Sequence, residues 1–380
     1  MTHRIERRPL GAGTPGTRRE VMLHRFGEPG ARPKAYFQAA IHADEIPALL
    51  AAHHLVRRLM AAEAEGAIRG EIVVAPFANP IGLDQQVNAT HLGRHELGGG
   101  GNFNRNWPDL FPATAEKVAD KLTDSEAANV AAIRAALAEV VAEMRPRTQL
   151  DSLRQILVGE AVDADLVFDM HCDDDALMHL FLVPQHWPLA ADIAAELGCH
   201  AVMLCEDSGG DSFDEALSTP WIKLARQYPD HPIPAACLSN TVEFRGQRDV
   251  NDRLAVADGA ALFRILQRHG VVDGDPGPLP EALCAATPLD ACEFVKAPAP
   301  GVLSYEVELG ERVEKDQVIA WLIDPAAEDP NAGRQAIRAG TAGLVLSRRD
   351  RLYVQPGDTL AKVVGREPLT VPKEKNLLGD

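Results

Sequence analysis

The tetrapeptide His42-Ala43-Asp44-Glu45 carries the clearest chemical signal in the sequence. It follows a predicted strand and starts a predicted helix, so the histidine and the glutamate, three residues apart, can face one side of the first helical turn. One imidazole and one carboxylate can then reach the same small cation, and these ligand types suit Zn²⁺. Taken alone, the H-x-x-E spacing also fits a helix cap or a pair of surface residues.

A second histidine, His171, lies just after the apolar run of the segment FDMHCDDD at 168–175. Sites in open α/β sheets form at the carboxyl ends of strands, and His42 occupies the same kind of position. Three protein ligands with an open fourth position are the arrangement of a catalytic zinc site. Taken without its neighbours, His171 fits a buried, hydrogen-bonded histidine better than a metal ligand. Acids that could orient the ligands are Asp44, Asp169 and Asp173.

A polar motif, NFNRNWP (102–108), directly follows four consecutive glycines at 98–101. The planar guanidinium of Arg105 can bind a carboxylate through two parallel hydrogen bonds, and Asn104 can add a third. The motif therefore predicts a site for a substrate carboxylate, with an ordinary solvated loop as the alternative.

A glutamate, Glu243, interrupts the apolar strand pattern of TVEFRG (241–246). A carboxylate inside such a strand is costly unless it is paired or functional. Arg245 is a poor partner, because side chains two apart on a strand share a face but seldom clasp. Either a catalytic role for Glu243 or a salt bridge to another arginine fits the pattern.

Together, the four motifs resemble one family, the succinylglutamate desuccinylase/aspartoacylase branch of the zinc carboxypeptidase (M14-like) superfamily. The motifs come in the family's order, and the resemblance covers roughly residues 20–270. It implies that His42, Glu45 and His171 bind one Zn²⁺ per chain. It also implies that Glu243 is the general base.

The same resemblance implies that Asn104 and Arg105 hold the carboxylate of the substrate. Arg94 is the nearby candidate for the arginine that polarises the scissile carbonyl, although its spacing is loose. The chain departs from the family pattern at Ala43, where glycine is usual, and at Asn102, where aspartate is frequent.

The resemblance thus implies a zinc-dependent hydrolase that cleaves the linear amide bond of a small, carboxylated N-acyl amino acid. Zinc would lower the pKa of a bound water to about 7, and the glutamate would accept its proton. A carboxypeptidase acting on short peptides would use the same site. A non-catalytic binding or carrier protein is the alternative from another class.

The elements that must position these residues alternate along the first part of the chain. Strands are expected at 21–26, 35–41, 71–77, 163–170, 179–184, 199–204 and 238–245, and helices at 45–62, 114–143, 188–197 and 252–269. No regular element is expected within 81–113. This alternation predicts a three-layer α/β/α domain with a largely parallel or mixed sheet, assigned to residues 1–285.

After the Pro- and Gly-rich stretch 270–290, the pattern changes to short strands separated by glycine turns. The segments 301–322 and 343–364 share one plan, and this pair of half-motifs resembles the barrel-sandwich fold of biotinyl and lipoyl domains. Carrier versions present a lysine between the halves, whereas residues 321–343 contain none. A small all-β domain at 286–370 is therefore predicted to serve structure, oligomer contacts or access to the site, followed by a tail at 371–380.

The composition of the 380 residues is that of a globular protein, with 46% hydrophobic and 24% charged residues. The net charge of −17 argues against nucleic-acid and anionic-membrane partners. The N-terminus lacks the apolar core of a secretory signal, and the six cysteines lack C-x-x-C spacing. These features predict a cytoplasmic protein with reduced cysteines, and a homo-oligomer is compatible with them.

Overall fold

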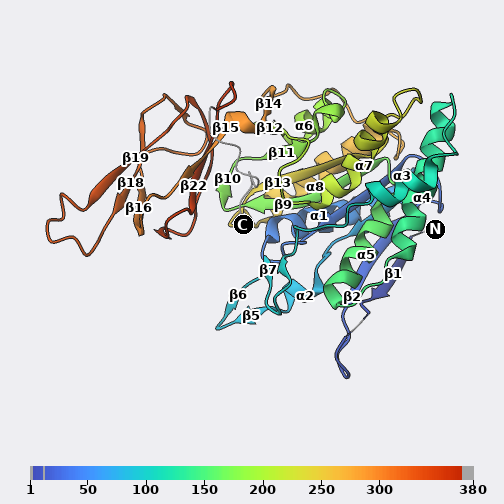
Figure 1. Cartoon of the computed structure of the whole chain (residues 1–380), viewed down its shortest axis with the longest axis horizontal. Helices are drawn as coiled ribbons and strands as arrows, with labels where there is room; N and C mark the ends of the chain where they lie inside the picture. The colour runs from blue at the N-terminus through green and yellow to red at the C-terminus, as the bar shows by residue number, and fades with distance from the viewer. Residues whose placement is uncertain (1–2, 12, 370–380) are drawn as a thin grey trace.

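The structure, a computed structural model, describes residues 3–11 and 13–369, so the predicted tail at 371–380 lies outside the described residues. Figure 1 shows a large α/β body and, beside it, a smaller β region built from the C-terminal strands, drawn in orange and red. No helix within the described residues is both long enough and apolar enough to cross a membrane.

A mixed sheet forms the middle layer of the α/β body. Its strands among the described residues are, in spatial order, β1 (Arg4–Pro9), β2 (Glu20–Phe26), β4 (Glu71–Ala75), β3 (Lys34–Ala39), β9 (Leu166–Asp173), β13 (Leu238–Gly246), β11 (His179–Leu182), β12 (Ala201–Leu204) and β14 (Ala286–Pro288). The central strands β4, β3, β9 and β13 are parallel, whereas β1 and β2 pair with their neighbours in antiparallel fashion. Strand β11 is antiparallel to β13 and parallel to β12. The predicted mixed sheet is confirmed.

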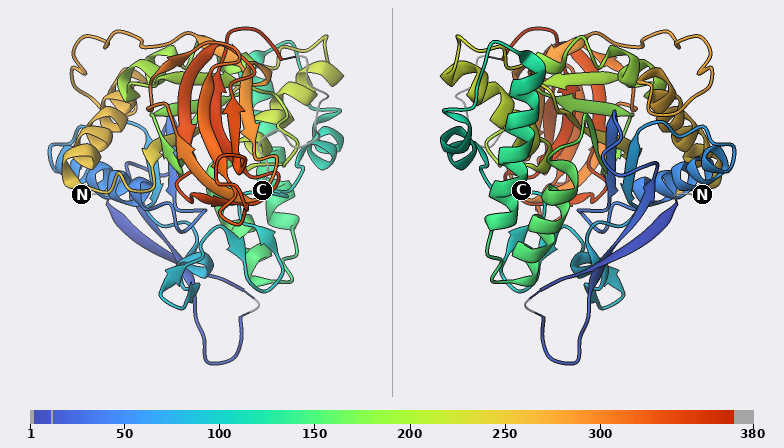
Figure 2. Two further views of the ribbon diagram at one scale, coloured as in Figure 1. Left: turned by 90° about the vertical axis from the view of Figure 1, so that its left-hand side faces the viewer. Right: turned by 90° about the vertical axis from the view of Figure 1, so that its right-hand side faces the viewer.

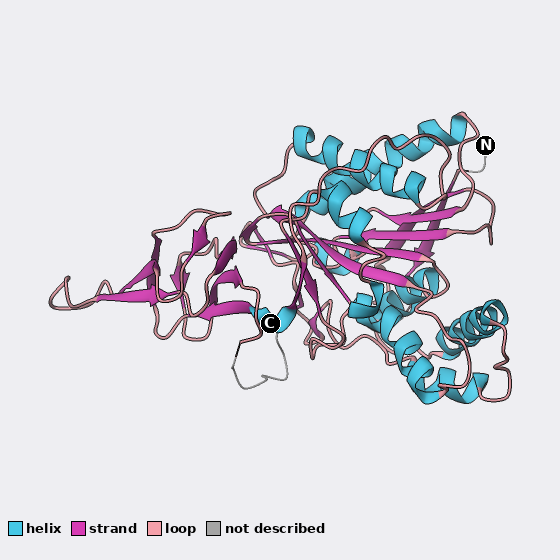
Figure 3. Ribbon diagram, turned by 90° about the horizontal axis from the view of Figure 1, so that it is seen from above, coloured by secondary structure: helices cyan, strands magenta, loops and turns pink. Residues whose placement is uncertain are grey.

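Helices cover both faces of this sheet (Figure 3). One apolar core unites it with α1 (Ile46–Ala64), α6 (Ala191–Leu197) and α8 (Asp252–Arg268). The core on the opposite face contains α3 (Phe111–Val118), α4 (Glu126–Glu143), α5 (Gln149–Ala161) and α7 (Phe213–Gln227). Because every central strand is buried on both sides, the strands appear in the sequence as nearly continuous apolar runs.

Several elements differ from the expectation. The single helix predicted at 114–143 is two helices, because Ser125 caps a new helix by accepting a hydrogen bond from the Ala128 amide. Because alanines flank the break on both sides, the sequence pattern predicts one continuous helix. Helix α5, which begins with a capping box at Thr148, and helix α7, which contains Pro220, were not expected.

The segment expected to lack regular structure contains only short elements. These are α2 (Pro80–Leu83) and the small hairpins β5 (Gln86–Val87) with β6 (Thr90–His91) and β7 (His95–Glu96) with β8 (Gly101–Asn102). The remaining short elements of the α/β body are the 3₁₀ turns η1 (Pro184–His186) and η2 (Leu289–Ala291).

The C-terminal region is all-β, as predicted, and its described residues form two antiparallel sheets. One contains β10 (Asp175–Ala176), β20 (Gly343–Arg348), β22 (Thr359–Val364), β15 (Cys292–Lys296) and β17 (Arg312–Val313). The other contains β19 (Arg334–Arg338), β18 (Val318–Ile323), β16 (Gly301–Tyr305) and β21 (Tyr353–Val354). Apolar side chains such as Leu303, Ile319 and Val345 fill the core of this region.

The two parts of the chain are joined by more than the connecting segment. Strand β10 leaves the α/β body and pairs with β20, and an apolar cluster containing Phe181, Met203 and Leu346 lies at the same junction. Strand β14, directly after the predicted boundary at residue 285, pairs with β12, so the large sheet extends to Pro288. Figure 2 shows the C-terminal sheets against the end of the α/β body.

Two glycines make room for the turn between β3 and α1. The Ala43 amide donates a hydrogen bond to the Gly93 carbonyl at 2.9 Å, so the segment after β6 lies directly on the turn. A Cβ added to Gly93 would lie 2.2 Å from the backbone nitrogen of Asp44. A Cβ on Gly82 would lie 2.9 Å from the Cβ of Ala43, which is fully buried. The backbone of the turn therefore requires glycine at position 93, and the methyl group of Ala43 requires it at position 82.

Replacing Gly93 by alanine should destabilise the protein by about 1–3 kcal/mol, because the added methyl group meets backbone that has no rotamer to change. Urea unfolding measures this loss. The control is Gly159→Ala in α5, where the new Cβ would meet only Val141 at 3.5 Å. That variant should be neutral or gain up to about 1 kcal/mol. Equal stability of Gly93→Ala and wild type would contradict the tight contact.

Candidate active site

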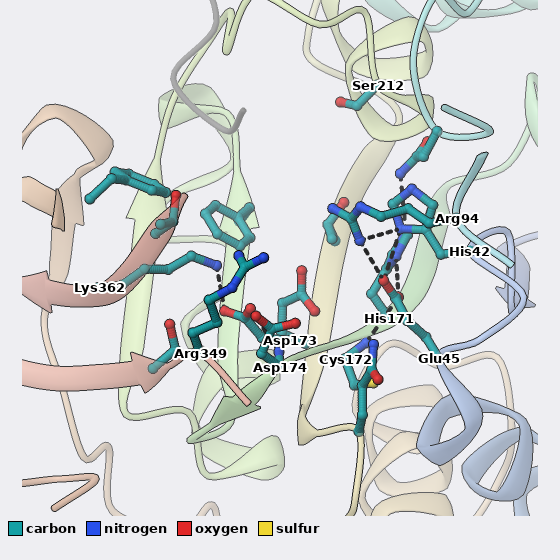
Figure 4. Close-up of a pocket in the computed structure, with 18 of the residues that line it drawn as sticks. His42, Glu45, Arg94, His171, Cys172, Asp173, Asp174, Ser212, Arg349 and Lys362 are labelled. Carbon is teal, nitrogen blue, oxygen red and sulfur yellow. Dashed lines mark hydrogen bonds and ion pairs between the residues drawn. The ribbon is translucent and has the colours of Figure 1, made fainter. Parts of the chain in front are cut away.

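A cavity of about 600 Å³ opens at the carboxyl ends of the central strands. His42 and His171 line it on one side, and Arg349 and Lys362 of the C-terminal β region line it on the other. Figure 4 shows these two groups facing each other across the cavity. Both parts of the chain therefore form its walls.

Three buried side chains form a candidate metal cluster. Nδ1 of His42 lies 2.9 Å from Oε1 of Glu45, and Nδ1 of His171 lies 2.7 Å from Oε2 of the same glutamate. One potential ligand atom from each residue lies within 4.8 Å of the other two. The structure thus brings together the three residues that the sequence motifs assign to a metal.

Strand pairing accounts for this convergence. The neighbouring strands β3 and β9 are parallel, so their carboxyl ends lie at the same edge of the sheet. After β3, Ala40 adopts a left-handed backbone conformation and the chain turns into α1, whose first turn contains Pro47. This turn directs His42 and Glu45 towards His171 on β9.

The outer nitrogens of both imidazoles are held by oxygen atoms. Nε2 of His42 lies 2.8 Å from Oδ1 of Asn102, and Nε2 of His171 lies 2.9 Å from Oδ2 of Asp169. Such contacts fix the ring orientation of metal-binding histidines and leave the other nitrogen for the ion. Two imidazole nitrogens and a carboxylate are a donor set of catalytic zinc sites, so the residues fit a divalent ion.

The electrostatics of the cluster also favour a cation. Burial, assisted by the charge of Arg94, lowers the pKa of His42 to about 4, so this imidazole is neutral. Burial alone would raise the pKa of Glu45, but the neighbouring His42 and His171 hold it well below its usual value. An ionised carboxylate thus lies between the two rings. The pKa of His171 is raised because Asp169 and Glu45 outweigh its burial.

Asn104 lines the cavity next to His171, and its amide is hydrogen-bonded within the protein. Its Nδ2 donates to Oδ2 of Asp169 at 3.1 Å and lies 3.1 Å from Nε2 of His171. Its Oδ1 accepts hydrogen bonds from the Trp107 indole at 2.8 Å and from the Phe213 amide at 3.1 Å. Both ends of the amide are therefore engaged within the protein, and the contact of Asn104 with the substrate carboxylate stays a prediction.

Arg105 lines the cavity and is largely buried. Its Nη1 donates to the Asn104 carbonyl at 2.9 Å, and its aliphatic part packs on Gly210, where a Cβ would lie 2.5 Å from Cδ of the arginine. Arg154 in turn donates to the Arg105 carbonyl at 2.6 Å. These contacts hold the guanidinium in a restricted position.

Arg94 lies at the metal cluster, just before hairpin β7–β8. Its Nη1 is 3.1 Å from Oε1 of Glu45 and 3.3 Å from Nδ1 of His42. The side chain is 40% exposed and lines the cavity. Arg94, whose distance in sequence from Asn104-Arg105 fits the family pattern only loosely, therefore lies next to the three candidate metal ligands.

Glu243 lies beside His171, because the two residues are directly paired on the parallel strands β13 and β9. Its Oε2 is buried and has no hydrogen-bond partner. Burial, followed by the negative charge of Glu45, raises the pKa of Glu243 to about 8. Arg245 is not its partner, since that guanidinium pairs with Asp258. The structure thus presents an unpaired carboxyl group at the cluster.

Several supporting residues were not identified from the sequence alone. Trp107 orients Asn104, and Gln38 donates a hydrogen bond to Asp169 at 2.8 Å. The signal for Trp107 was its place in the same motif, and the signal for Gln38 was a polar residue in an otherwise apolar strand. Asn102, which the sequence marks only as a departure from the family pattern, holds the imidazole of His42 through its side-chain oxygen.

Comparison with known proteins agrees with this geometry. Residues 31–268 match the catalytic domain of succinylglutamate desuccinylase/aspartoacylase. The chain is 24% identical over 336 residues to the N-alpha-acetyl-L-2,4-diaminobutyric acid deacetylase of Halomonas elongata, a match that covers 88% of this chain and 82% of the relative.

Two solved structures show the same fold over nearly the whole chain. A protein of the succinylglutamate desuccinylase/aspartoacylase group from Shewanella frigidimarina has a TM-score of 0.83 at 23% identity, covering 96% of this chain and 97% of the other. Its counterpart from Shewanella amazonensis has a TM-score of 0.81 at 23% identity, covering 95% and 98%. The match to the catalytic domain spans more than half of the chain, and the chain therefore belongs to the succinylglutamate desuccinylase/aspartoacylase family.

Proposed function

We propose that this protein is a metal-dependent amidohydrolase that removes the acyl group from a small N-acyl amino acid. The observation that carries the proposal is the cluster of His42, Glu45 and His171 with the unpaired carboxyl group of Glu243 beside it. The name of the Halomonas relative, a deacetylase of an acetylated amino acid, supports the same reaction.

His42, Glu45 and His171 would hold one Zn²⁺. When bound at such a site, zinc lowers the pKa of water and polarises a carbonyl group, which together overcome the inertness of an amide. Asn102 and Asp169 keep the two imidazoles oriented for this task through their contacts with the outer nitrogens.

Glu243 would act as the general base. Its carboxyl group has a raised pKa, so its ionised form binds a proton more tightly than an ordinary glutamate. The unpaired Oε2 can accept the proton of the attacking water and later deliver it to the departing amine. Because no protein donor is hydrogen-bonded to this oxygen, no hydrogen bond has to break before the proton is transferred.

Arg105 would bind the carboxylate of the substrate, since a guanidinium held by surrounding contacts loses little freedom on binding. Asn104 would keep His171 and Asp169 in place. Arg94, partly exposed at the cluster, would stabilise the negative charge that develops on the carbonyl oxygen.

The cavity of about 600 Å³ suits a small substrate. A carboxypeptidase acting on short peptides would use the same residues, and the substrate panel below separates the two reactions. The cytoplasmic location and the oligomeric state stay predictions.

Removal of the metal with a chelator should abolish deacylation of N-acetyl amino acids, and added Zn²⁺ should restore it. Metal content and activity are measured on the same sample, with dipeptides tested in parallel. A preference for dipeptides would favour the carboxypeptidase, and protein without stoichiometric metal would favour a binding protein.

Glu243→Gln should lower kcat by about 10²–10⁴-fold while metal content stays unchanged, because the amide cannot accept the proton. Steady-state kinetics and metal analysis measure the two quantities. Glu139→Gln, a matched change at an exposed helical position, is the control. Full activity of Glu243→Gln would remove the proposed base.

Arg105→Lys should raise KM by about 10- to 100-fold with a smaller change in kcat, because an ammonium cannot form the paired hydrogen bonds to a carboxylate. Arg145→Lys, at an exposed position two residues after the end of α4, is the control. An unchanged KM would show that the carboxylate binds elsewhere.

A further inference from the structure

A lysine of the C-terminal β region enters the cavity. Lys362 lies on β22, yet its ammonium group pairs with the carboxylate of Asp173 at the end of β9. Both side chains are largely buried, at 15% and 16% exposure. The Lys362 ammonium also lies 5.8 Å from the centre of the Phe294 ring, which confines it. Figure 4 shows Lys362 extending towards Asp173.

The position of Asp173 links this ion pair to the metal cluster. Asp173 follows His171 by two residues on the same strand, so the two side chains share one face of the sheet. Glu243, on the neighbouring strand, is paired directly with His171. A change in the surroundings of Asp173 therefore acts within the immediate environment of the cluster.

Lys362 is the principal counter-charge of Asp173. Among the described residues, it is the only lysine or arginine within 4.0 Å of that carboxylate. The nearest imidazole, Nε2 of His179, is 3.9 Å away. Without Lys362, Asp173 would add an uncompensated charge to a region that already contains Glu45, Asp169 and Glu243.

Attachment of the C-terminal region does not depend on this pair. The β10–β20 strand pairing, the apolar cluster around Leu346 and the ion pair of Arg348 with Asp175 already join the two parts. An additional buried ion pair is therefore not needed to hold the region in place, and its location in the cavity indicates a different role.

We infer that Lys362 is a positioning residue of the active site, through which the C-terminal β region holds Asp173 away from the metal cluster. A buried carboxylate that loses its cation must find another partner, and a cation bound by His42, Glu45 and His171, of which His171 lies on the same strand, would be such a partner. The effect on catalysis rests on the proposed function, whereas the effect on metal binding does not.

The test compares Lys362→Met with wild type in the full chain. We expect kcat to fall about tenfold or more with little change in KM, and Zn²⁺ to bind about three- to tenfold more tightly, because the freed carboxylate is drawn to the ion. Competition of the protein with a chromophoric chelator for Zn²⁺ measures the second effect without any substrate.

The decisive comparison repeats the Lys362→Met substitution in protein that already carries Asp173→Asn. If Lys362 acts through Asp173, Lys362→Met should have little additional effect on kcat or zinc affinity in Asp173→Asn protein. Lys362→Arg, which preserves the charge, should restore most of the activity. Asp175→Asn, which removes the half-buried ion pair with Arg348 at the same junction, should change kcat by less than about twofold.

Equal effects of Lys362→Met in both backgrounds, or wild-type kinetics and zinc affinity in Lys362→Met, would overturn the inference. Should Lys362→Met fail to fold, the double variant Lys362→Gln with Asp173→Asn replaces the buried charges by a neutral pair and is compared with Asp173→Asn alone. Absence of deacylase activity in wild type would instead refute the proposed function, while the chelator competition would still test the role of Lys362.

Discussion

One carboxylate, that of Glu45, determines the geometry of the site. Its two oxygens reach Nδ1 of His42 and Nδ1 of His171, so residues from two parts of the sequence meet at a single side chain. Burying an ionised group of this kind is unfavourable without compensation, and the two rings and the guanidinium of Arg94 provide it. The parallel pairing of β3 and β9 makes the contact achievable, and most of the helices serve to bury those strands.

The sequence was informative where function depends on local spacing. The turn that contains His42 and Glu45 follows a strand and begins a helix, so its geometry could be inferred without long-range information. Glu243 could be identified because a carboxylate contradicts the apolar pattern of its strand. The mixed α/β architecture was also predictable, since alternating apolar runs and helices determine the layers, and the resemblance of the four ordered motifs indicated the family.

Long-range contacts were not predictable in the same way. The pair of Lys362 and Asp173 joins residues 189 positions apart, and nothing in the local pattern of either strand indicates it. The role of Asn104 also depends on such contacts, because its amide is held by Trp107 and by the start of α7, a helix whose internal proline obscured it. Local periodicity specifies which elements form, whereas contacts between elements specify which polar group is left free to react.

The close packing around Ala43 has a consequence for how such a site can diversify. Gly82 and Gly93 both face this residue, so the three positions share one small volume. A Cβ at position 82 would be tolerated more readily if position 43 first became glycine, which makes the order of these two substitutions matter, whereas a Cβ at position 93 meets backbone that no substitution at position 43 removes. Positions 43 and 82 should therefore show epistasis, and variation at one of them among related sequences should be accompanied by compensating variation at the other.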